Sequence, residues 1–379
     1  MEFQYSLPVH IIFGNGKIFC IGEEAGKYGN KALIVAGKNS MRRVGVLEKL
    51  TDSLKYASVE WVLYDQIAPN PTLSMVKKGA EFAKMHGCHM VIGIGGGSVM
   101  DAAKGIAFAV KNKGDLADYL YNKKNGEGAL PILLIPTTCG TGSEGNGFSV
   151  LTDEVTGNKK SLRYDALIPR VSIVDPVLMS SMPKDILAVV GFDALCHLME
   201  AYVSRLHQPI SDLYCLEGMR IISRYLIPLY KGEGNEEDFE KIAWASTLGG
   251  MSIYIAGVTA LHGMEHPLSG LRDLIHGKGL AALAPGIINA SAKGNKERYG
   301  VVSRIFGGAD DRDCGMRVQK IIDDLQLKVV LSEEGFDRSD VDWLVDNCLE
   351  VSPAGMNNNP VIFQPDEIRK LYLQAFDGR

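Results

Sequence analysis

A strand that runs directly into a glycine cluster and then into a helix constrains this sequence most. Residues 89–94 (HMVIGI) form an apolar run typical of a buried strand, and residues 99–111 have helical spacing. The cluster GIGGGS (residues 93–98) joins them. Glycines let the backbone approach a ligand closely, and the free N–H groups at a helix start attract anions. We therefore favour phosphate binding over a close strand–helix crossing without a ligand, although the cluster matches neither GxGxxG nor the P-loop.

The first half of the sequence alternates apolar runs of strand length with amphipathic helical runs. Strands are predicted at 31–36, 59–64, 89–94 and 130–136, and helices at 44–56, 73–86 and 99–111. Such alternation is typical of βαβ units, which build a parallel sheet covered by helices on both faces. We expect an α/β, Rossmann-like N-terminal domain.

The pattern changes near Met182-Pro183, and long helical stretches follow without convincing strand alternation. They cover 184–205, 211–226, 237–261, 312–325 and 365–376. We expect a dinucleotide-binding α/β domain over 1–182 and an all-α metal-binding and substrate domain over 183–379. The uncharged segment 242–261 has the length of a membrane span, but its glycines, serines and threonines favour a helix buried among helices.

Charge and cysteine usage exclude several classes of protein. The 40 Lys and Arg residues against 45 Asp and Glu residues give a net charge of −5, which argues against a nucleic-acid partner. Seven cysteines are an odd number without a CxxC pair, which indicates reduced thiols rather than disulfides. No signal-peptide pattern is apparent at the N-terminus, so we expect a cytoplasmic protein without a membrane partner.

A second loop of glycines and hydroxyls follows the strand at 130–136. It reads PTTCGTGSE (residues 136–144) and would lie at the carboxyl end of a parallel strand, where open α/β sheets bind ligands. An ordinary polar turn is the alternative. Two such loops after two strands favour a dinucleotide crevice more than either loop alone.

Histidines and one acid in the second half form a candidate metal site. His262, His266 and His276 lie within fifteen residues, and Asp193 and His197 are four apart on one predicted helix face. A lone histidine on an apolar face is usually a satisfied core residue. A carboxylate and several imidazoles on neighbouring helices instead favour a cage for Fe(II), Zn(II) or a similar ion.

Four ordered motifs resemble the iron-containing (group III) alcohol dehydrogenase family. They are GIGGGSVMDAAKGIA (93–107), IPTTCGTGSE (135–144), GFDALCHLMEAYVSR (191–205), and HGMEHPLSG followed by IHGKG (262–270 and 275–279). The details GSEGNGFS, and MEH where many members have MAH, are most similar to the butanol dehydrogenase-like branch. The resemblance implies a dehydroquinate synthase-like architecture.

The resemblance also implies roles for individual residues of the second half. Metal ligation falls on Asp193, His197, His262 and His276, because the ligand histidine and the histidine of the HG pair lie fourteen apart in the family, as they do here. His266 matches the family histidine near the nicotinamide and is the candidate catalytic proton relay.

Cofactor-binding positions follow from the same resemblance. They are Gly37, Ser40, Asn70, Gly96, Gly97, Ser98, Asp101, Thr137, Thr138, Thr141 and Lys159, with Lys160 as an alternative to Lys159. Family members that prefer NAD place an acid directly after the strand that is predicted here at 31–36. Gly37, Ser40 and the nearby Arg42-Arg43 would instead accommodate a 2′-phosphate, so we predict NADP(H) in preference to NAD(H).

The implied function is a metal-dependent alcohol dehydrogenase or aldehyde reductase. It would transfer hydride between NADP(H) and a small alcohol or aldehyde of the butanol type, with Fe(II) or Zn(II), as a homodimer or larger homo-oligomer. The alternatives are a dehydroquinate synthase-like or glycerol dehydrogenase-like metalloenzyme for a polyol or sugar-derived substrate, a metal hydrolase, and an inactive cofactor-binding module. Two departures from the family pattern are Cys139 for the usual Ala and Val361 for the Arg of an NPR triplet.

Overall fold

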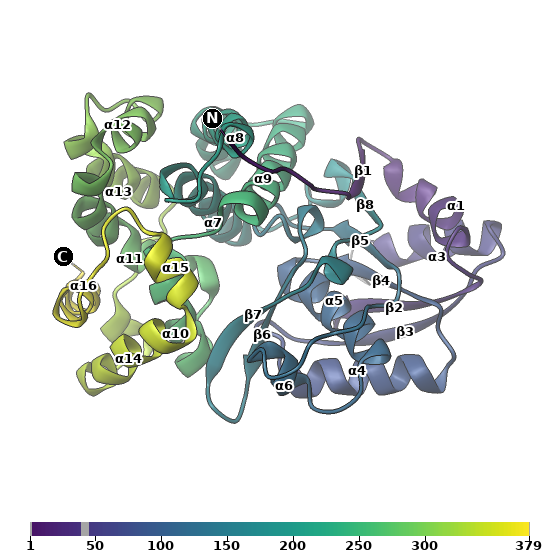
Figure 1. The fold of residues 1–379 in the computed structure, drawn as a ribbon. Coiled ribbons are helices and arrows are strands. Elements are labelled where there is room, and N and C mark those ends of the chain that lie inside the picture. Colours follow the sequence, from purple (N-terminus) through teal and green to yellow (C-terminus); the bar gives the residue numbers. More distant parts are fainter. Residues whose placement is uncertain (1, 39–44, 379) are drawn as a thin grey trace. The chain divides into compact units, whose positions relative to one another are not determined.

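The chain folds into two compact units. The computed structural model describes residues 2–38 and 45–378. One unit contains Ser6–Thr156 and Lys160–Met182, and the other contains Gly157–Lys159 and everything from Pro183 onward, together with the N-terminal residues up to Tyr5. In Figure 1 the first unit runs from purple to teal and the second from teal to yellow. Two short segments that precede residue 183 thus group with the helical unit.

A six-stranded parallel sheet forms the centre of the α/β unit. Its spatial order is β1 (His10–Phe13), β8 (Val171–Val174), β5 (Ile132–Pro136), β4 (Met90–Gly95), β2 (Lys31–Gly37) and β3 (Glu60–Ile67). Strand order reverses between β2 and β4, because β3 lies beyond β2 on one side and β5 beyond β4 on the other. Such a reversal point is where open α/β sheets bind their ligands at the carboxyl ends of the strands.

Helices cover both faces of this sheet, as the alternating strand and helix runs predict. They are α1 (Ile21–Gly26), α3 (Val46–Tyr56), α4 (Leu73–Met85), α5 (Gly97–Lys111) and α6 (Leu116–Leu120). Ala32 and Ile34 of β2 pack with α1 and α3, whereas Leu33 and Val35 pack with α4 and α5. Strands buried on both faces read as continuous apolar runs, which is why their positions were predictable.

Four strands were not predicted. Edge strand β1 and strand β8 are only four residues long, and β6 (Phe148–Asp153) and β7 (Asn158–Arg163) form a separate two-stranded sheet. Short or polar strands give a weak periodic signal. The predicted helix start at residue 44 lies outside the described residues.

The second unit is helical. Its helices are α7 (Lys184–Val203), α8 (Pro209–Lys231), α9 (Glu236–Ala256), α10 (Ala260–Arg272), α11 (His276–Ser291), α12 (Lys296–Ile305), α13 (Cys314–Asp324), α14 (Val341–Val351), α15 (Pro353–Asn358) and α16 (Pro365–Asp377). α7 is long and apolar enough to cross a membrane, but 83% of its apolar window is buried. Burial among other helices explains its composition.

One helix prediction was wrong. The expected helix over 237–261 is two helices, since α9 ends at Ala256 and α10 begins at Ala260 with a bend of 105°. Gly257 takes a positive φ of 69° at the break, and its N–H still bonds to Ile253 O at 2.9 Å. Ser204 and Asn358 satisfy the freed carbonyl of Ala256. The bend places His262 in the first turn of α10.

Candidate metal centre and cofactor loops

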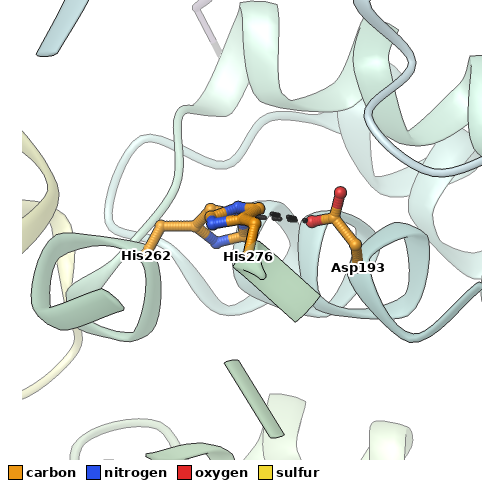
Figure 2. Close-up of side chains that lie close together, drawn as sticks. All are labelled: Asp193, His262 and His276. Atoms are coloured by element: carbon orange, nitrogen blue, oxygen red, sulfur yellow. Dashed lines mark ion pairs between the residues drawn. The ribbon is translucent and has the colours of Figure 1, made fainter. Parts of the chain in front are cut away.

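Four side chains from three helices converge in the helical unit. Asp193 and His197 lie one turn apart on α7, His262 lies in the first turn of α10, and His276 is the first residue of α11. Figure 2 shows Asp193 facing the rings of His262 and His276. The side chain of His276 is 23% exposed, whereas those of the other three are 3–6% exposed. We call these four residues the metal cluster.

The distances within the metal cluster fit ligands of a common ion better than hydrogen bonds. Asp193 Oδ1 lies 3.6 Å from Nε2 of His197, 3.5 Å from Nε2 of His262 and 3.7 Å from Nε2 of His276. A hydrogen bond would bring such atoms to about 2.9 Å, whereas two ligands of a tetrahedral ion with bonds of about 2.1 Å lie about 3.4 Å apart. Among the described residues, Asp193 Oδ1 and His262 Nε2 are buried without a hydrogen-bond partner.

The charge states without an ion are set by burial and by these neighbours. Burial lowers the pKa of His197 to about 4, so its ring is neutral at pH 7 and able to bind a metal. Burial also opposes a proton on His262, but the carboxylates of Glu200 and Asp193 outweigh it and raise the pKa of His262 to about 10. A metal ion that bound Nε2 of His262 would therefore displace a proton.

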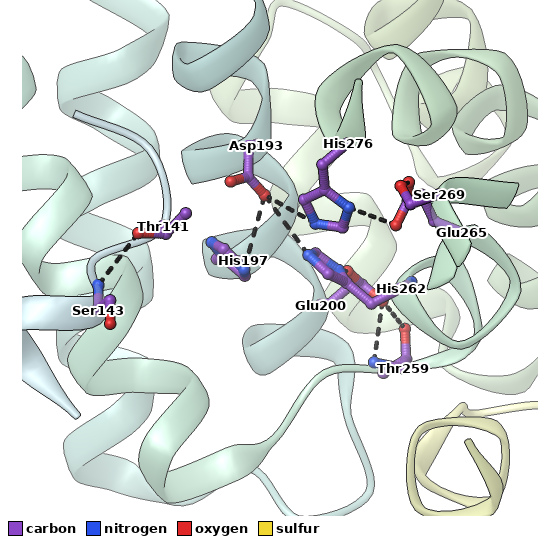
Figure 3. A network of polar contacts seen from close by, with 10 residues as sticks. All are labelled: Thr141, Ser143, Asp193, His197, Glu200, Thr259, His262, Glu265, Ser269 and His276. Atoms are coloured by element: carbon purple, nitrogen blue, oxygen red, sulfur yellow. Dashed lines mark hydrogen bonds and ion pairs between the residues drawn. The ribbon is translucent and has the colours of Figure 1, made fainter. Parts of the chain in front are cut away.

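Two buried glutamates hold the outer nitrogens of the metal cluster. Glu200 Oε2 bonds to Nδ1 of His262, and Glu265 Oε2 pairs with Nδ1 of His276 (Figure 3). A carboxylate on Nδ1 fixes the tautomer and orientation of a ring, so that Nε2 carries the lone pair for a metal. In both rings Nε2 is the nitrogen that faces Asp193.

Glu200 is itself held firmly at the start of α10. Its Oε1 accepts hydrogen bonds from the N–H of Thr259 at 2.9 Å, from Thr259 Oγ1 at 2.8 Å and from the N–H of His262 at 3.2 Å. Burial opposes ionisation of this carboxyl, but the charge of His262 and the bonds from Thr259 outweigh it and lower the pKa of Glu200. The α9–α10 bend and the orientation of His262 therefore depend on the same carboxylate.

Sequence reasoning missed Glu200, Glu265 and Thr259. The signal was present in the spacing, because Glu200 is one turn beyond His197 and Glu265 is one turn beyond His262 on the same helix. His266 was predicted, and its ring lies edge-on to His262 with a centroid separation of 6.2 Å. Its centroid is 5.8 Å from that of His276.

In the α/β unit the two predicted cofactor loops contact each other. Thr137 N donates to Gly95 O at 2.9 Å, where β4 and β5 end side by side. A Cβ on Gly97 would lie 2.3 Å from Thr141 Cγ2, and one on Gly96 would lie 3.1 Å from Thr138 Oγ1. The contact at Gly97 leaves no room for a side chain, and the one at Gly96 leaves little. The N-terminus of the 15-residue helix α5 therefore lies beside the threonines, which is suitable for a phosphate.

A buried lysine joins α5 to the second loop. Lys104 Nζ donates to Ser143 O, Ser143 Oγ and Phe148 O at 2.7 Å each, and to Asn146 Oδ1 at 3.2 Å. Asp101 completes this Lys104 network, since its Oδ1 accepts from Ser143 Oγ at 2.6 Å and its Oδ2 from Val150 N at 3.0 Å. Burial lowers the pKa of Lys104 to about 8. The predicted cofactor residue Asp101 thus lies inside this network.

The remaining predicted cofactor residues lie apart in the sequence. Gly37 ends β2, Ser98 lies in the first turn of α5, and Asn70 adopts a positive φ of 48° before Pro71. Lys159 is buried on β7 and groups with the helical unit, whereas Lys160 groups with the α/β unit. Ser40 and Arg42-Arg43 lie outside the described residues.

The fold and the metal cluster are typical of enzymes that depend on a metal and a dinucleotide. Comparison with known proteins identifies the family. Residues 8–176 match the family described as iron-containing alcohol dehydrogenase, and residues 187–376 match the C-terminal region of the Fe-containing alcohol dehydrogenase family. The chain belongs to the iron-containing alcohol dehydrogenase family. The predicted family and fold class are confirmed.

Relatives align with this chain over almost its whole length. The NADPH-dependent butanol dehydrogenase of Clostridium saccharobutylicum is 30% identical over 99% of this chain and 98% of its own. The 1,3-propanediol dehydrogenase of Citrobacter freundii is 30% identical over 99% of both chains. The crystal structure of NADH-dependent butanol dehydrogenase A from Thermotoga maritima superimposes with a TM-score of 0.91 and 30% identity, covering 99% of this chain and 98% of that one.

Membership defines the class of reaction. The protein is an oxidoreductase acting on CH–OH groups, and its family uses NAD(P) and a divalent metal. The predicted enzyme class is therefore confirmed, and the comparisons give no support to the dehydroquinate synthase-like or glycerol dehydrogenase-like alternative. Relatives include both NADPH- and NADH-dependent enzymes.

Proposed function

We propose that this enzyme reversibly reduces small aldehydes of the butanal type to alcohols, with NADPH as hydride donor and a divalent metal in the metal cluster. The observation that carries the proposal is the convergence of Asp193 Oδ1 with three imidazole Nε2 atoms at 3.5–3.7 Å. One carboxylate and three imidazoles suit Fe(II) or Zn(II). The proposed ligands are Asp193, His197, His262 and His276.

The protein's own residues orient and enclose this chemistry. The ion supplies Lewis-acid polarisation of the substrate oxygen and the nicotinamide supplies or accepts the hydride. Glu200 and Glu265 hold the rings of His262 and His276 with Nε2 inward. Asp193 and His197 are buried, which excludes bulk water from their side of the site. We assign His266 as the residue that exchanges a proton with solvent, since its half-buried ring lies beside the metal cluster.

In the α/β unit we propose that Gly96, Gly97 and Ser98 hold the cofactor pyrophosphate. Thr137, Thr138 and Thr141 would contact the cofactor from the second loop, and Asn70 and Lys159 or Lys160 would add polar contacts. In this proposal Asp101 acts through the Lys104 network, which fixes the second loop. The proposed division of roles gives the dinucleotide to residues 1–182 and the metal to residues 183–379.

The preference for NADP(H) is also a proposal. Its support is the absence of a carboxylate at Gly37, the end of β2, where an acid would repel a 2′-phosphate. Comparison of kcat/KM for NADPH and NADH with one aldehyde tests it. A higher value with NADH would contradict it.

We further propose a cytoplasmic homodimer or larger homo-oligomer. All seven cysteines are free and six of them are buried, which suits a reducing compartment. Sedimentation of the metal-loaded enzyme would test the oligomer, and a single-chain mass would contradict it.

The proposed reaction can be tested in one assay. NADPH oxidation is followed at 340 nm with butanal, using apoprotein and apoprotein loaded with one equivalent of Fe(II) or Zn(II). The loaded protein should consume NADPH and the apoprotein should not. Equal rates in both samples, or no rate in either, would contradict the proposal.

A further inference from the structure

Glu265 is a fully buried carboxylate next to the most exposed member of the metal cluster. Its side chain has no exposed surface, and its Oε2 faces Nδ1 of His276. Burial of a charge is costly unless partners compensate it. The partners of this carboxylate are Nδ1 of His276 at Oε2 and the hydroxyl of Ser269 at Oε1.

The helices around Glu265 are shaped to admit its carboxylate. A Cβ on Gly279, in the first turn of α11, would lie 2.7 Å from Glu265 Oε1. Ser269, one turn further along α10, donates to Glu265 Oε1, and its Oγ also lies 3.0 Å from Leu274 O at the connection into α11. Gly279, which has no side chain, therefore leaves room for the carboxylate of Glu265, and the hydroxyl of Ser269 donates a hydrogen bond to it.

His276 is the ligand that needs such support most. It is the first residue of α11, and it follows the half-exposed Ile275. Ends of helices fray more readily than their interiors. His197 lies inside α7. His262 is held by Glu200, and Glu200 is itself fixed by hydrogen bonds from Thr259, the N-cap of α10, and from the N–H of His262. Without a partner on Nδ1, His276 could turn away from Asp193 by rotation at the helix end.

We propose that Glu265 is a positioning residue that keeps His276 on the metal and so slows metal release. This inference rests on the proposed metal site. Three buried carboxylates, Asp193, Glu200 and Glu265, would then surround one divalent ion. The third carboxylate adds attraction for the ion in addition to fixing the ring.

The test measures metal release rather than turnover. Holoenzyme is mixed with a chromogenic chelator, and release is followed for wild type, Glu265→Gln, Glu265→Ala and the control Glu297→Gln, an exposed residue in the first turn of α12. We expect release from Glu265→Ala to be about 10- to 100-fold faster than from wild type. Glu265→Gln keeps a hydrogen-bond acceptor without the charge and should fall between them, and the control should match wild type.

Ser269→Ala keeps Glu265 but removes one of its hydrogen bonds. This variant tests the proposal if the Glu265 variants fail to fold. We expect about fivefold faster release, the equivalent of one ordinary hydrogen bond. With Co(II) in place of the native ion, visible bands should change in Glu265→Ala, because the His276 ring is no longer fixed. The bands should not change in Glu297→Gln.

Each outcome separates the two proposals. Equal release from wild type and all variants, with one tightly held ion in each, would overturn the role of Glu265 and leave the metal site standing. A wild-type protein that binds no ion would overturn both. Glu265, His266 and His276 also have donor atoms within 4.8 Å of one another. A second equivalent of metal in wild type that Glu265→Ala loses would overturn the positioning role, since Glu265 would then be a ligand.

Discussion

Two buried polar clusters, one in each unit, differ in whether their atoms satisfy one another. In the Lys104 network an ammonium meets four oxygens and both oxygens of Asp101 accept hydrogen bonds. In the metal cluster Asp193 Oδ1 and His262 Nε2 face each other at 3.5 Å without a hydrogen bond. Buried polar atoms are nearly always paired in native proteins. A complete cluster therefore indicates a structural role, and an incomplete one whose donors converge indicates a bound ion.

The largest expected effect comes from Asp193→Asn in the metal cluster. The amide presents a weaker ligand to the ion, so we expect loss of bound metal and a fall in kcat/KM of about a thousandfold or more, since Lewis-acid polarisation supplies several kcal/mol. Elemental analysis and the 340 nm assay measure both quantities. Asp185→Asn, an exposed position in the first turn of α7, is the control. Stoichiometric metal in Asp193→Asn would contradict the assignment.

The corresponding change in the complete cluster should affect folding instead. Lys104→Met leaves the Asp101 carboxylate and the carbonyls of Ser143 and Phe148 without their cation. We expect the free energy of unfolding to fall by about 3–5 kcal/mol. Urea titration followed by circular dichroism measures this. The exposed Lys78→Met on α4 should stay within about 0.5 kcal/mol of wild type. Folded Lys104→Met protein should still bind one equivalent of metal, and loss of metal would break the comparison.

A smaller effect is expected where the two cofactor loops touch. Gly97→Ala brings a methyl group against Thr141 and must separate the loops, which costs about 1–3 kcal/mol. We expect weaker NADPH binding by about tenfold, with unchanged metal content. Fluorescence titration of the cofactor measures the Kd. An unchanged Kd would show that the close approach of these loops does not shape the cofactor site.

The pH dependence of stability is the mildest test of the Lys104 network. Burial lowers the pKa of Lys104 to about 8, whereas a lysine in an unfolded chain has a pKa of about 10.4. Between these values the unfolded chain binds more protons than the folded chain, so the contribution of Lys104 to stability rises as pH increases through that window. The difference in unfolding free energy between wild type and Lys104→Met should therefore grow from pH 8 to pH 10. A difference that shrinks would contradict the lowered pKa.

Local patterns made much of this molecule predictable. The run from Gly93 to Ser98 reads as strand, loop and helix in a single stretch, and Asp193 and His197 share a face at a spacing of four. Neither needs knowledge of a distant residue. The positions of the buried strands β2, β3, β4 and β5 along the chain followed from the same kind of local pattern, whereas their order in the sheet did not.

Long-range partners were not predictable in the same way. Glu200 and Glu265 look like ordinary helical acids until α10 and α11 bring histidines to them. The break at Gly257 was missed because Gly249 and Gly250 of the same uncharged stretch lie inside α9, so a glycine alone does not mark the end of this helix. The bend also depends on Glu200, Ser204 and Asn358 from elsewhere in the unit.

The most direct test of the metal cluster is anomalous diffraction from crystals of the metal-loaded enzyme at the absorption edge of the ion. The structure predicts a single peak bonded to Asp193 Oδ1 and to Nε2 of His197, His262 and His276, at about 2.0–2.2 Å from each. A peak bonded instead to Glu265 and His266, or no ordered ion in active protein, would contradict it.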